Sequence, residues 1–185
     1  LLDYAINASL VLSYVAMRKD DKAGLVTFNE YFDTFVPASK QVGQMQTLLE
    51  NLYKQETTFG ETDFSALCGH LGKHVNKRSF LVLYTNFSNM TSLNRQLVYL
   101  QQLARQHRVL VVFFEDADLK EYIAGKSVTT EDYYRHVIAE KFAFEKRLIV
   151  STLKQHGIYS LLTTPDKLSI DVINKYLEMK SRQLL

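Results

Sequence analysis

The strongest constraint on the fold of this chain is a run of six consecutive apolar residues, Val109–Phe114, with a charged residue on either side. Apart from one leucine, every residue in the run is β-branched or aromatic, which favours a strand. A strand that is apolar on both faces is typical of a parallel sheet covered by helices on its two sides. The run therefore predicts an α/β fold with this strand in its interior.

Helical and strand patterns alternate along the rest of the chain. Apolar residues at helical spacing predict helices up to about residue 18 and over about 40–53, 63–75, 93–104, 130–156 and 165–177. Strands are predicted at 24–28, 33–36, 80–84 and 158–162, the first two forming a hairpin that Pro37 ends. Gly157 is expected to end the long helix, and Thr164 to cap the last one. This order predicts a doubly wound, mostly parallel sheet with one antiparallel edge strand and helices on both faces.

The composition is that of a folded protein with no affinity for nucleic acid. The 185 residues, 46% of them apolar, suffice for a single domain with a sizeable core. The 22 basic and 20 acidic residues are mixed along the chain, so no basic stripe is available for phosphates. Apolar runs are far shorter than the roughly 20 residues that span a bilayer, so we expect no membrane contact by this segment. Its single cysteine, Cys68, excludes an internal disulfide bond and fits a reducing compartment.

Three polar turns are placed where ligands bind in open α/β sheets. Such ligands lie at the carboxyl ends of strands and the amino ends of helices. Thr85–Asn89 follows one predicted strand, Glu115–Asp118 follows another, and Thr58–Asp63 precedes a helix. Their oxygen atoms suit a divalent cation or a docked partner, although acidic residues at a helix start also simply favour the helix dipole. The candidate partner-facing edge comprises Glu61, Asp63, Ser88, Glu115, Asp116 and Asp118.

Five segments carry a family resemblance through their order and spacing: Leu2–Ile6, Val15–Phe28, Glu61–Leu67, Val82–Asn86 and Tyr176–Arg182. Together they resemble a von Willebrand factor A-type domain, and more closely the bacterial family called domain of unknown function 58. The resemblance covers nearly the whole chain and implies a Rossmann-type, three-layer fold of the von Willebrand factor A kind.

The resemblance also implies a metal-ion-dependent adhesion site. Such a site takes an Asp-x-Ser-x-Ser from the first strand, a threonine from the second loop and an aspartate after the fourth strand. Thr62 matches the threonine, Asn86 stands where the aspartate belongs, and the Asp-x-Ser-x-Ser would lie before Leu1. A neutral amide in place of a carboxylate weakens the binding of Mg²⁺. We therefore expect a degenerate, incomplete site, with no cofactor in this segment and Mg²⁺ in the intact protein. Alternatively, Thr62 caps a helix and Asn86 forms an Asx-turn.

The chain begins inside a helical pattern and without methionine, which indicates that further sequence precedes it. In the resembled family the first strand is central, between the strands at 24–28 and 80–84. Without that strand two buried sheet edges lack hydrogen-bond partners, which is costly. We therefore expect an upstream strand to fill this position, and a gap or a repaired pairing when it is absent.

Two other groups of side chains have alternative interpretations. His70 and His74 lie four residues apart on a helix and offer two ligands to zinc, but no third ligand is near in the sequence. Solvated surface histidines are the simpler interpretation. The long helix bears four aromatic residues on more than one face, Tyr133, Tyr134, Phe142 and Phe144. We expect most of them to lie in the core, with a surplus face left for a partner.

Two functional hypotheses follow. The resemblance implies a non-enzymatic protein–protein interaction module that works with a MoxR-type AAA+ ATPase in the assembly or activation of other proteins. It also implies a cytoplasmic domain whose parent protein is anchored in the bacterial inner membrane. The alternative is a small α/β hydrolase-like or nucleotide-binding enzyme that uses Asn86 with the Glu115–Asp118 edge, although no nucleophile elbow or glycine-rich phosphate loop is present.

Overall fold

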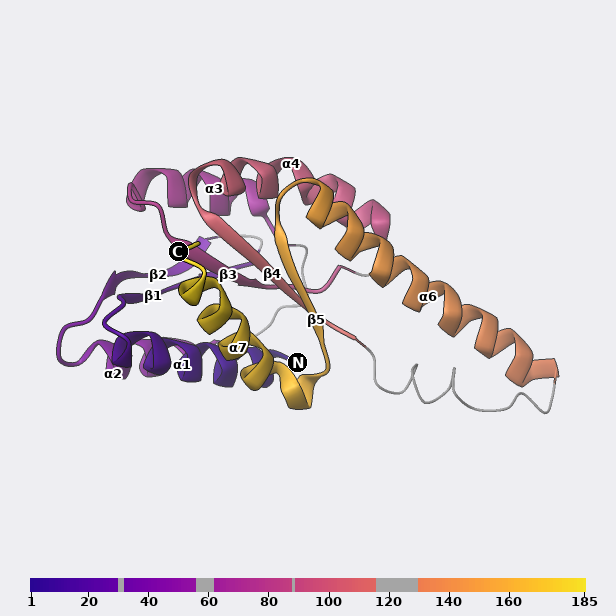
Figure 1. The fold of residues 1–185 in the computed structure, drawn as a ribbon, viewed down its shortest axis with the longest axis horizontal. Coiled ribbons are helices and arrows are strands. Elements are labelled where there is room, and N and C mark those ends of the chain that lie inside the picture. The colour runs from indigo at the N-terminus through magenta and orange to yellow at the C-terminus, as the bar shows by residue number, and fades with distance from the viewer. Residues whose placement is uncertain (30–31, 56–61, 88, 116–129) are drawn as a thin grey trace. The chain divides into compact units, whose positions relative to one another are not determined.

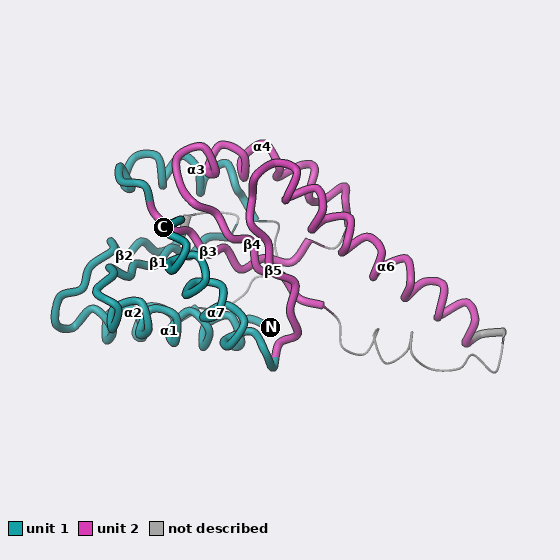
Figure 2. Tube along the Cα trace, in the orientation of Figure 1, with its two compact units in different colours: residues 1–78, 166–185 teal, residues 79–165 magenta. Residues whose placement is uncertain are grey.

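The computed structural model describes residues 1–29, 32–55, 62–87, 89–115 and 130–185. The chain falls into two compact units, residues 1–78 with 166–185 and residues 79–165 (Figure 2). The first unit contains α1 (Leu2–Arg18), β1 (Ala23–Phe28), β2 (Phe32–Ser39), α2 (Gln44–Tyr53), α3 (Phe64–His74) and α7 (Leu168–Ser181). The second contains β3 (Phe80–Tyr84), α4 (Met90–Gln106), β4 (Arg108–Phe114), α6 (Thr130–Gln155) and β5 (Tyr159–Thr163).

The first unit is an antiparallel hairpin, β1–β2, packed among helices (Figure 1). Helix α1 contacts α2, α7 and β1, while α3 contacts β2. Ala23, Val36 and Leu48 form a buried cluster against which Leu10, Met17, Leu25 and Met45 pack. The predicted hairpin is thereby confirmed, and it is stabilised by burying one face against helices.

Strand β2 does not end at Pro37 as the sequence suggested. It continues to Ser39, and its pairing with β1 is irregular between Ala23 and Leu25. Proline lacks a backbone donor and is tolerated at such an irregularity. Gly24 lies at the same point, where a Cβ would be 2.8 Å from the backbone oxygen of Val36. The local break in pairing therefore accommodates both residues.

The second unit contains a parallel sheet in the order β3-β4-β5. The middle strand is buried from Val109 to Phe114, which confirms the interior strand. Helix α4 contacts β4, and α6 contacts both β5 and α4 (Figure 1). Leu93, Leu100 and Leu103, which recur at helical spacing in the sequence, are buried in α4. The parallel sheet is thus packed against these two helices.

The helix ends follow local chemistry in most places. Asn89 begins α4 with a capping box: its side-chain oxygen accepts a hydrogen bond from the Ser92 amide, and its own amide donates to Ser92 Oγ. Gly157 has φ 70° and follows α6, as expected. The prediction for Thr164 is wrong: a 3₁₀ turn, Pro165–Lys167, comes first, and Lys167 precedes α7 without a side-chain capping bond. Proline fixes φ and starts a tighter turn there.

The described strands form two sheets, one antiparallel and one parallel, which confirms a mixed α/β class. Strands β1 and β3, between which the upstream strand is expected, belong to different sheets. The upstream strand, the single domain and the von Willebrand factor A-like arrangement stay predictions. No helix among the described residues is long and apolar enough to cross a membrane.

Candidate functional site

The turn after β3 is fixed to the sheet by its backbone. The Thr85 amide donates to the Val112 carbonyl oxygen at 3.0 Å, which extends the β3–β4 pairing by one residue. Phe87 is buried, whereas Asn86 between them is exposed. The turn therefore presents the Asn86 side chain at the carboxyl edge of the parallel sheet.

Lys146 of α6 reaches this turn. Its Nζ donates to Asn86 Oδ1 at 2.8 Å and to the Phe87 carbonyl oxygen at 2.7 Å. The same ammonium lies 5.5 Å from the centre of the Phe113 ring, within cation–π range. The Lys146 ammonium thus lies against the Asn86 amide oxygen, the atom that the family resemblance implies as a metal ligand. No local sequence pattern predicts this contact, because Lys146 lies 60 residues from Asn86.

The neighbouring strand ends are joined mainly through backbone groups. The Glu115 amide donates to the Thr163 carbonyl oxygen at 2.9 Å, so the β4–β5 pairing also continues past β4. Thr163 is buried, and its hydroxyl donates to the Thr164 carbonyl oxygen at 3.3 Å. Three other predicted edge residues, Ser88, Asp116 and Asp118, lie outside the described residues.

The polar turn before α3 serves as a helix start. Asp63 Oδ1 accepts a hydrogen bond from the Ala66 amide at 3.0 Å, and the Asp63 amide donates to the Asn29 carbonyl oxygen at 2.9 Å. Asp63 is therefore the N-cap, and the alternative in which Thr62 caps the helix is wrong. Thr62 is half-buried and belongs to the first unit, whereas Asn86 belongs to the second. Glu61 lies outside the described residues.

The two histidines of α3 pack on each other and on an aromatic ring. The centres of the His70 and His74 rings are 4.5 Å apart, and Phe35 lies 5.4 Å from His74. Desolvation lowers the pKa of His70, and the nearby His74 and Lys73 add to this effect. Burial raises the pKa of the Cys68 thiol to about 11. No three His, Cys, Asp or Glu side chains in the described part of the chain are grouped to hold a metal ion.

Comparison with known families identifies the chain. A family described as "Protein of unknown function DUF58" matches residues 2–129, which is more than half of the chain. The chain belongs to the DUF58 family. No curated protein and no solved structure matches it significantly. Asn86, Thr62 and Glu115 lie within the DUF58 match, whereas Lys146 lies beyond it.

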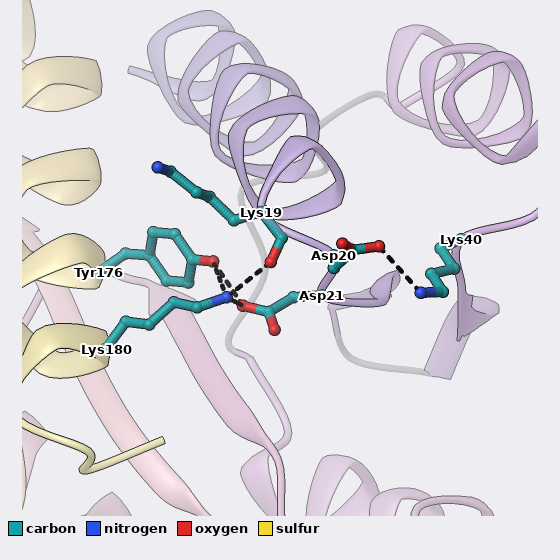
Figure 3. A network of polar contacts seen from close by, with 6 residues as sticks. All are labelled: Lys19, Asp20, Asp21, Lys40, Tyr176 and Lys180. Atoms are coloured by element: carbon teal, nitrogen blue, oxygen red, sulfur yellow. Dashed lines mark hydrogen bonds and ion pairs between the residues drawn. The ribbon is translucent and has the colours of Figure 1, made fainter.

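This DUF58 chain also contains a polar network that the sequence did not reveal (Figure 3). Asp20 has φ 66° and turns the chain at the end of α1, which brings Asp21 toward α7. Asp21 Oδ2 accepts hydrogen bonds from Tyr176 Oη at 2.5 Å and from Lys180 Nζ at 2.7 Å. Lys180 Nζ also donates to the Lys19 carbonyl oxygen at 2.9 Å. Both side-chain partners of Asp21 lie more than 150 residues away in the sequence, so no local pattern predicts these contacts.

The charges of this network reinforce one another. Burial opposes ionisation of Asp21, but the hydrogen bonds from Lys180 and Tyr176 outweigh it and lower the pKa of the carboxyl. The hydrogen bond to Asp21 raises the pKa of Lys180, and burial together with Asp21 raises that of Tyr176. At neutral pH the Asp21 carboxyl is therefore ionised, while Lys180 and Tyr176 keep their protons. The network anchors α1 to α7, and it is not poised to transfer a proton.

Proposed function

We propose that this DUF58 chain is a protein–protein interaction module without a catalytic step of its own, built on a von Willebrand factor A-like fold. The observation that supports this most is the contact between Lys146 and the turn at Asn86. An ammonium that donates to two fixed oxygen atoms holds a surface turn in one shape. A turn of fixed shape suits recognition, because less conformational entropy is lost on binding.

The described residues do not fit Mg²⁺ at Asn86. An ion bound to Asn86 Oδ1 would lie within about 5 Å of Lys146 Nζ, since the metal–oxygen distance is about 2.1 Å. At that separation the repulsion between a divalent ion and an ammonium amounts to several kcal/mol near a protein surface. We therefore propose that binding of the partner is independent of metal. Mg²⁺ in a longer form of the protein stays a prediction that depends on Thr62 and on upstream oxygen ligands.

The partner that we propose is a MoxR-type AAA+ ATPase, as the family resemblance implies. In this proposal the ATPase uses the module in assembling or activating other proteins, and the parent protein is anchored in the bacterial inner membrane. The alternative of an enzyme that combines Asn86 with Glu115, Asp116 and Asp118 stays a prediction. Two of its acidic residues lie outside the described part of the chain.

Affinity capture from native lysate tests the proposal. The bait is the chain itself, used in parallel with Mg²⁺ and with a chelator, and mass spectrometry identifies the captured proteins. Lys146→Gln removes the charge at the turn, and Lys154→Gln is the control because Lys154 is an exposed residue of the same helix. We expect the wild-type and Lys154→Gln baits to capture an AAA+ ATPase both with Mg²⁺ and with chelator. The Lys146→Gln bait should capture much less of this ATPase.

The other outcomes separate the hypotheses. Loss of the ATPase with chelator, or with a Thr62→Ala bait, would mean that a metal ion mediates the contact. Absence of an AAA+ ATPase from every capture would contradict this partner and would favour an activity screen for the enzyme.

A further inference from the structure

The exposed side of α6 carries a regular row of large residues. Tyr134, Val137, Lys141, Phe144 and Leu148 follow one another at alternating spacings of three and four residues, as the a and d positions of a heptad do. Tyr134 and Phe144 are 66% and 60% exposed, Val137 and Leu148 are 45% and 40% exposed, and Lys141 is exposed as well. We call these residues the α6 seam.

The α6 seam does not face the sheet. Helix α6 contacts β5 and α4, and its buried residues include Ala139, Ile149 and Leu153. On an ideal helix these three residues lie roughly 100–180° around the axis from the centre of the seam. The seam extends over roughly 21 Å of helix, at 1.5 Å per residue. A continuous row of this kind, left in water, is typical of an interaction surface.

The charges beside the seam are complementary to the same helix running in the opposite direction. Glu140 and Arg147 are exposed on one flank, seven residues apart, at equivalent heptad positions. In an antiparallel pair, Val137 faces Leu148 of the second copy, and Glu140 lies beside Arg147 of the second copy. A two-fold axis repeats each of these contacts. Opposite charges therefore meet on the flank, and apolar residues meet in the seam.

A parallel pair would place like charges together. Lys141 would face Lys141 of the second copy, and Glu140 would lie beside Glu145 of the second copy. In the antiparallel pair, Lys141 instead lies across the Phe144 ring of the second copy, where its stem packs and its ammonium makes a cation–π contact. The pattern of charges thus distinguishes the two directions and favours the antiparallel one.

We propose that the α6 seam is the interface of a homodimer in which two copies of this chain pair antiparallel through α6. This inference goes beyond the proposed function, because it concerns self-association and not the ATPase. One helix pair of about two heptads is a small interface, so the dimer forms in the micromolar range and depends on concentration.

Sedimentation velocity over a series of protein concentrations at low salt tests the homodimer. Arg147→Glu turns two attractive pairs into two repulsive ones, and we expect Kd to rise roughly ten-fold. Glu140→Arg combined with Arg147→Glu exchanges the charges and is expected to restore the dimer. Phe144→Asp is expected to give a monomer. Arg105→Glu, the same charge change at an exposed site on α4, is the control and should leave Kd unchanged.

Disulfide trapping tests the direction. A variant with both Val137→Cys and Leu148→Cys is expected to form a covalent dimer on oxidation, whereas either single variant is not. In the antiparallel pair two equivalent residues at position 137 lie about 16 Å apart along the axis, beyond the reach of a disulfide bond. Cys68 is buried and does not interfere. Trapping by the single variants, a Kd unaffected by Arg147→Glu, or a monomer at every concentration would each overturn the proposal.

Discussion

Asp21 illustrates how a single charged side chain connects segments that are distant in the sequence. Its side chain is 43% exposed, so its contribution is that of a partly screened ion pair with two hydrogen bonds. We predict that Asp21→Asn lowers the free energy of unfolding by about 1–2 kcal/mol at neutral pH. Asp20→Asn is the control, because its ion pair with Lys40 is highly exposed and asparagine tolerates a positive φ. Urea denaturation of both variants measures the difference.

The contribution of Asp21 depends on pH in a defined direction. The folded-state pKa of Asp21 is lowered, so the stabilisation is complete above the unfolded value of about 3.9 and is lost as the pH falls through the folded value. The wild type and Asp21→Asn should therefore converge in stability in acid. A gap that stays constant down to pH values well below 3.9 would show that the charge of Asp21 is not responsible.

His107 is predicted to make folding sensitive to mild acid. It is 2% exposed, and its Nδ1 accepts a hydrogen bond from the Ser79 amide at 3.3 Å. Burial lowers the pKa of His107, so the unfolded chain takes up a proton below about pH 6.5 before the folded chain does. Stability should thus fall as the pH drops from 7.5 to 5.5, by at most about 1.4 kcal/mol per pH unit for this residue.

Two variants isolate this contribution. His107→Gln should show a smaller loss of stability over the same pH range, and His156→Gln, which changes an exposed histidine, should behave as the wild type. Urea denaturation at each pH measures the free energy of unfolding of the three proteins. If all three lose the same amount of stability, the acid sensitivity is due to other groups such as His70.

At the scale of the residue, the polar turns were predictable from the sequence, but their partners were not. Asn86 and Asp63 were recognised as site candidates from their positions beside a strand and a helix. Their actual contacts differ in kind: Asp63 caps α3 through a neighbour three residues away, whereas Asn86 binds Lys146 from a distant helix. Only the first kind of contact leaves a local signal in the sequence. The Asp21–Tyr176 contact was missed for the same reason.

At the scale of the element, the predictions succeeded where one segment determines its own structure. The interior strand β4 and the end of α6 shortly before Gly157 are set by residues adjacent in the sequence. Strand β2 was predicted too short, because its passage through Pro37 depends on the irregular pairing with β1. The expectation that most aromatic residues of the long helix lie in the core is wrong, because Tyr133, Tyr134, Phe142 and Phe144 of α6 are all exposed. The occupant that we propose for this face follows from the flanking charges.

Gly24 provides an element-scale prediction for the β1–β2 hairpin. A Cβ at this position would lie 2.8 Å from the Ala38 amide nitrogen and from the Val36 carbonyl oxygen. Because backbone atoms cannot yield easily, Gly24→Ala should lower the free energy of unfolding by about 1–3 kcal/mol. Gly72→Ala on α3 is the matched control, since nothing lies within 4 Å of its added Cβ. That variant should gain about 0.5–1 kcal/mol from helix propensity. Thermal denaturation that ranks the two variants in the opposite order would contradict the close backbone approach at Gly24.

At the scale of the whole molecule, the chain is a DUF58 member with a parallel sheet in one compact unit and a helix-packed hairpin in the other. The family match supports the class of protein, and the contacts at the sheet edge support our proposal of recognition without catalysis. The central claim is that Lys146 holds the turn at Asn86 in the shape that the AAA+ ATPase binds.

The measurement that tests this claim most directly is the affinity of the purified ATPase, once captured, for the immobilised chain. It compares the wild type with Lys146→Gln and Lys154→Gln in the presence of chelator. The account predicts that Lys146→Gln weakens binding at least about ten-fold, which corresponds to about 1.4 kcal/mol, while Lys154→Gln binds as the wild type does. Equal affinities for all three proteins would contradict the central claim.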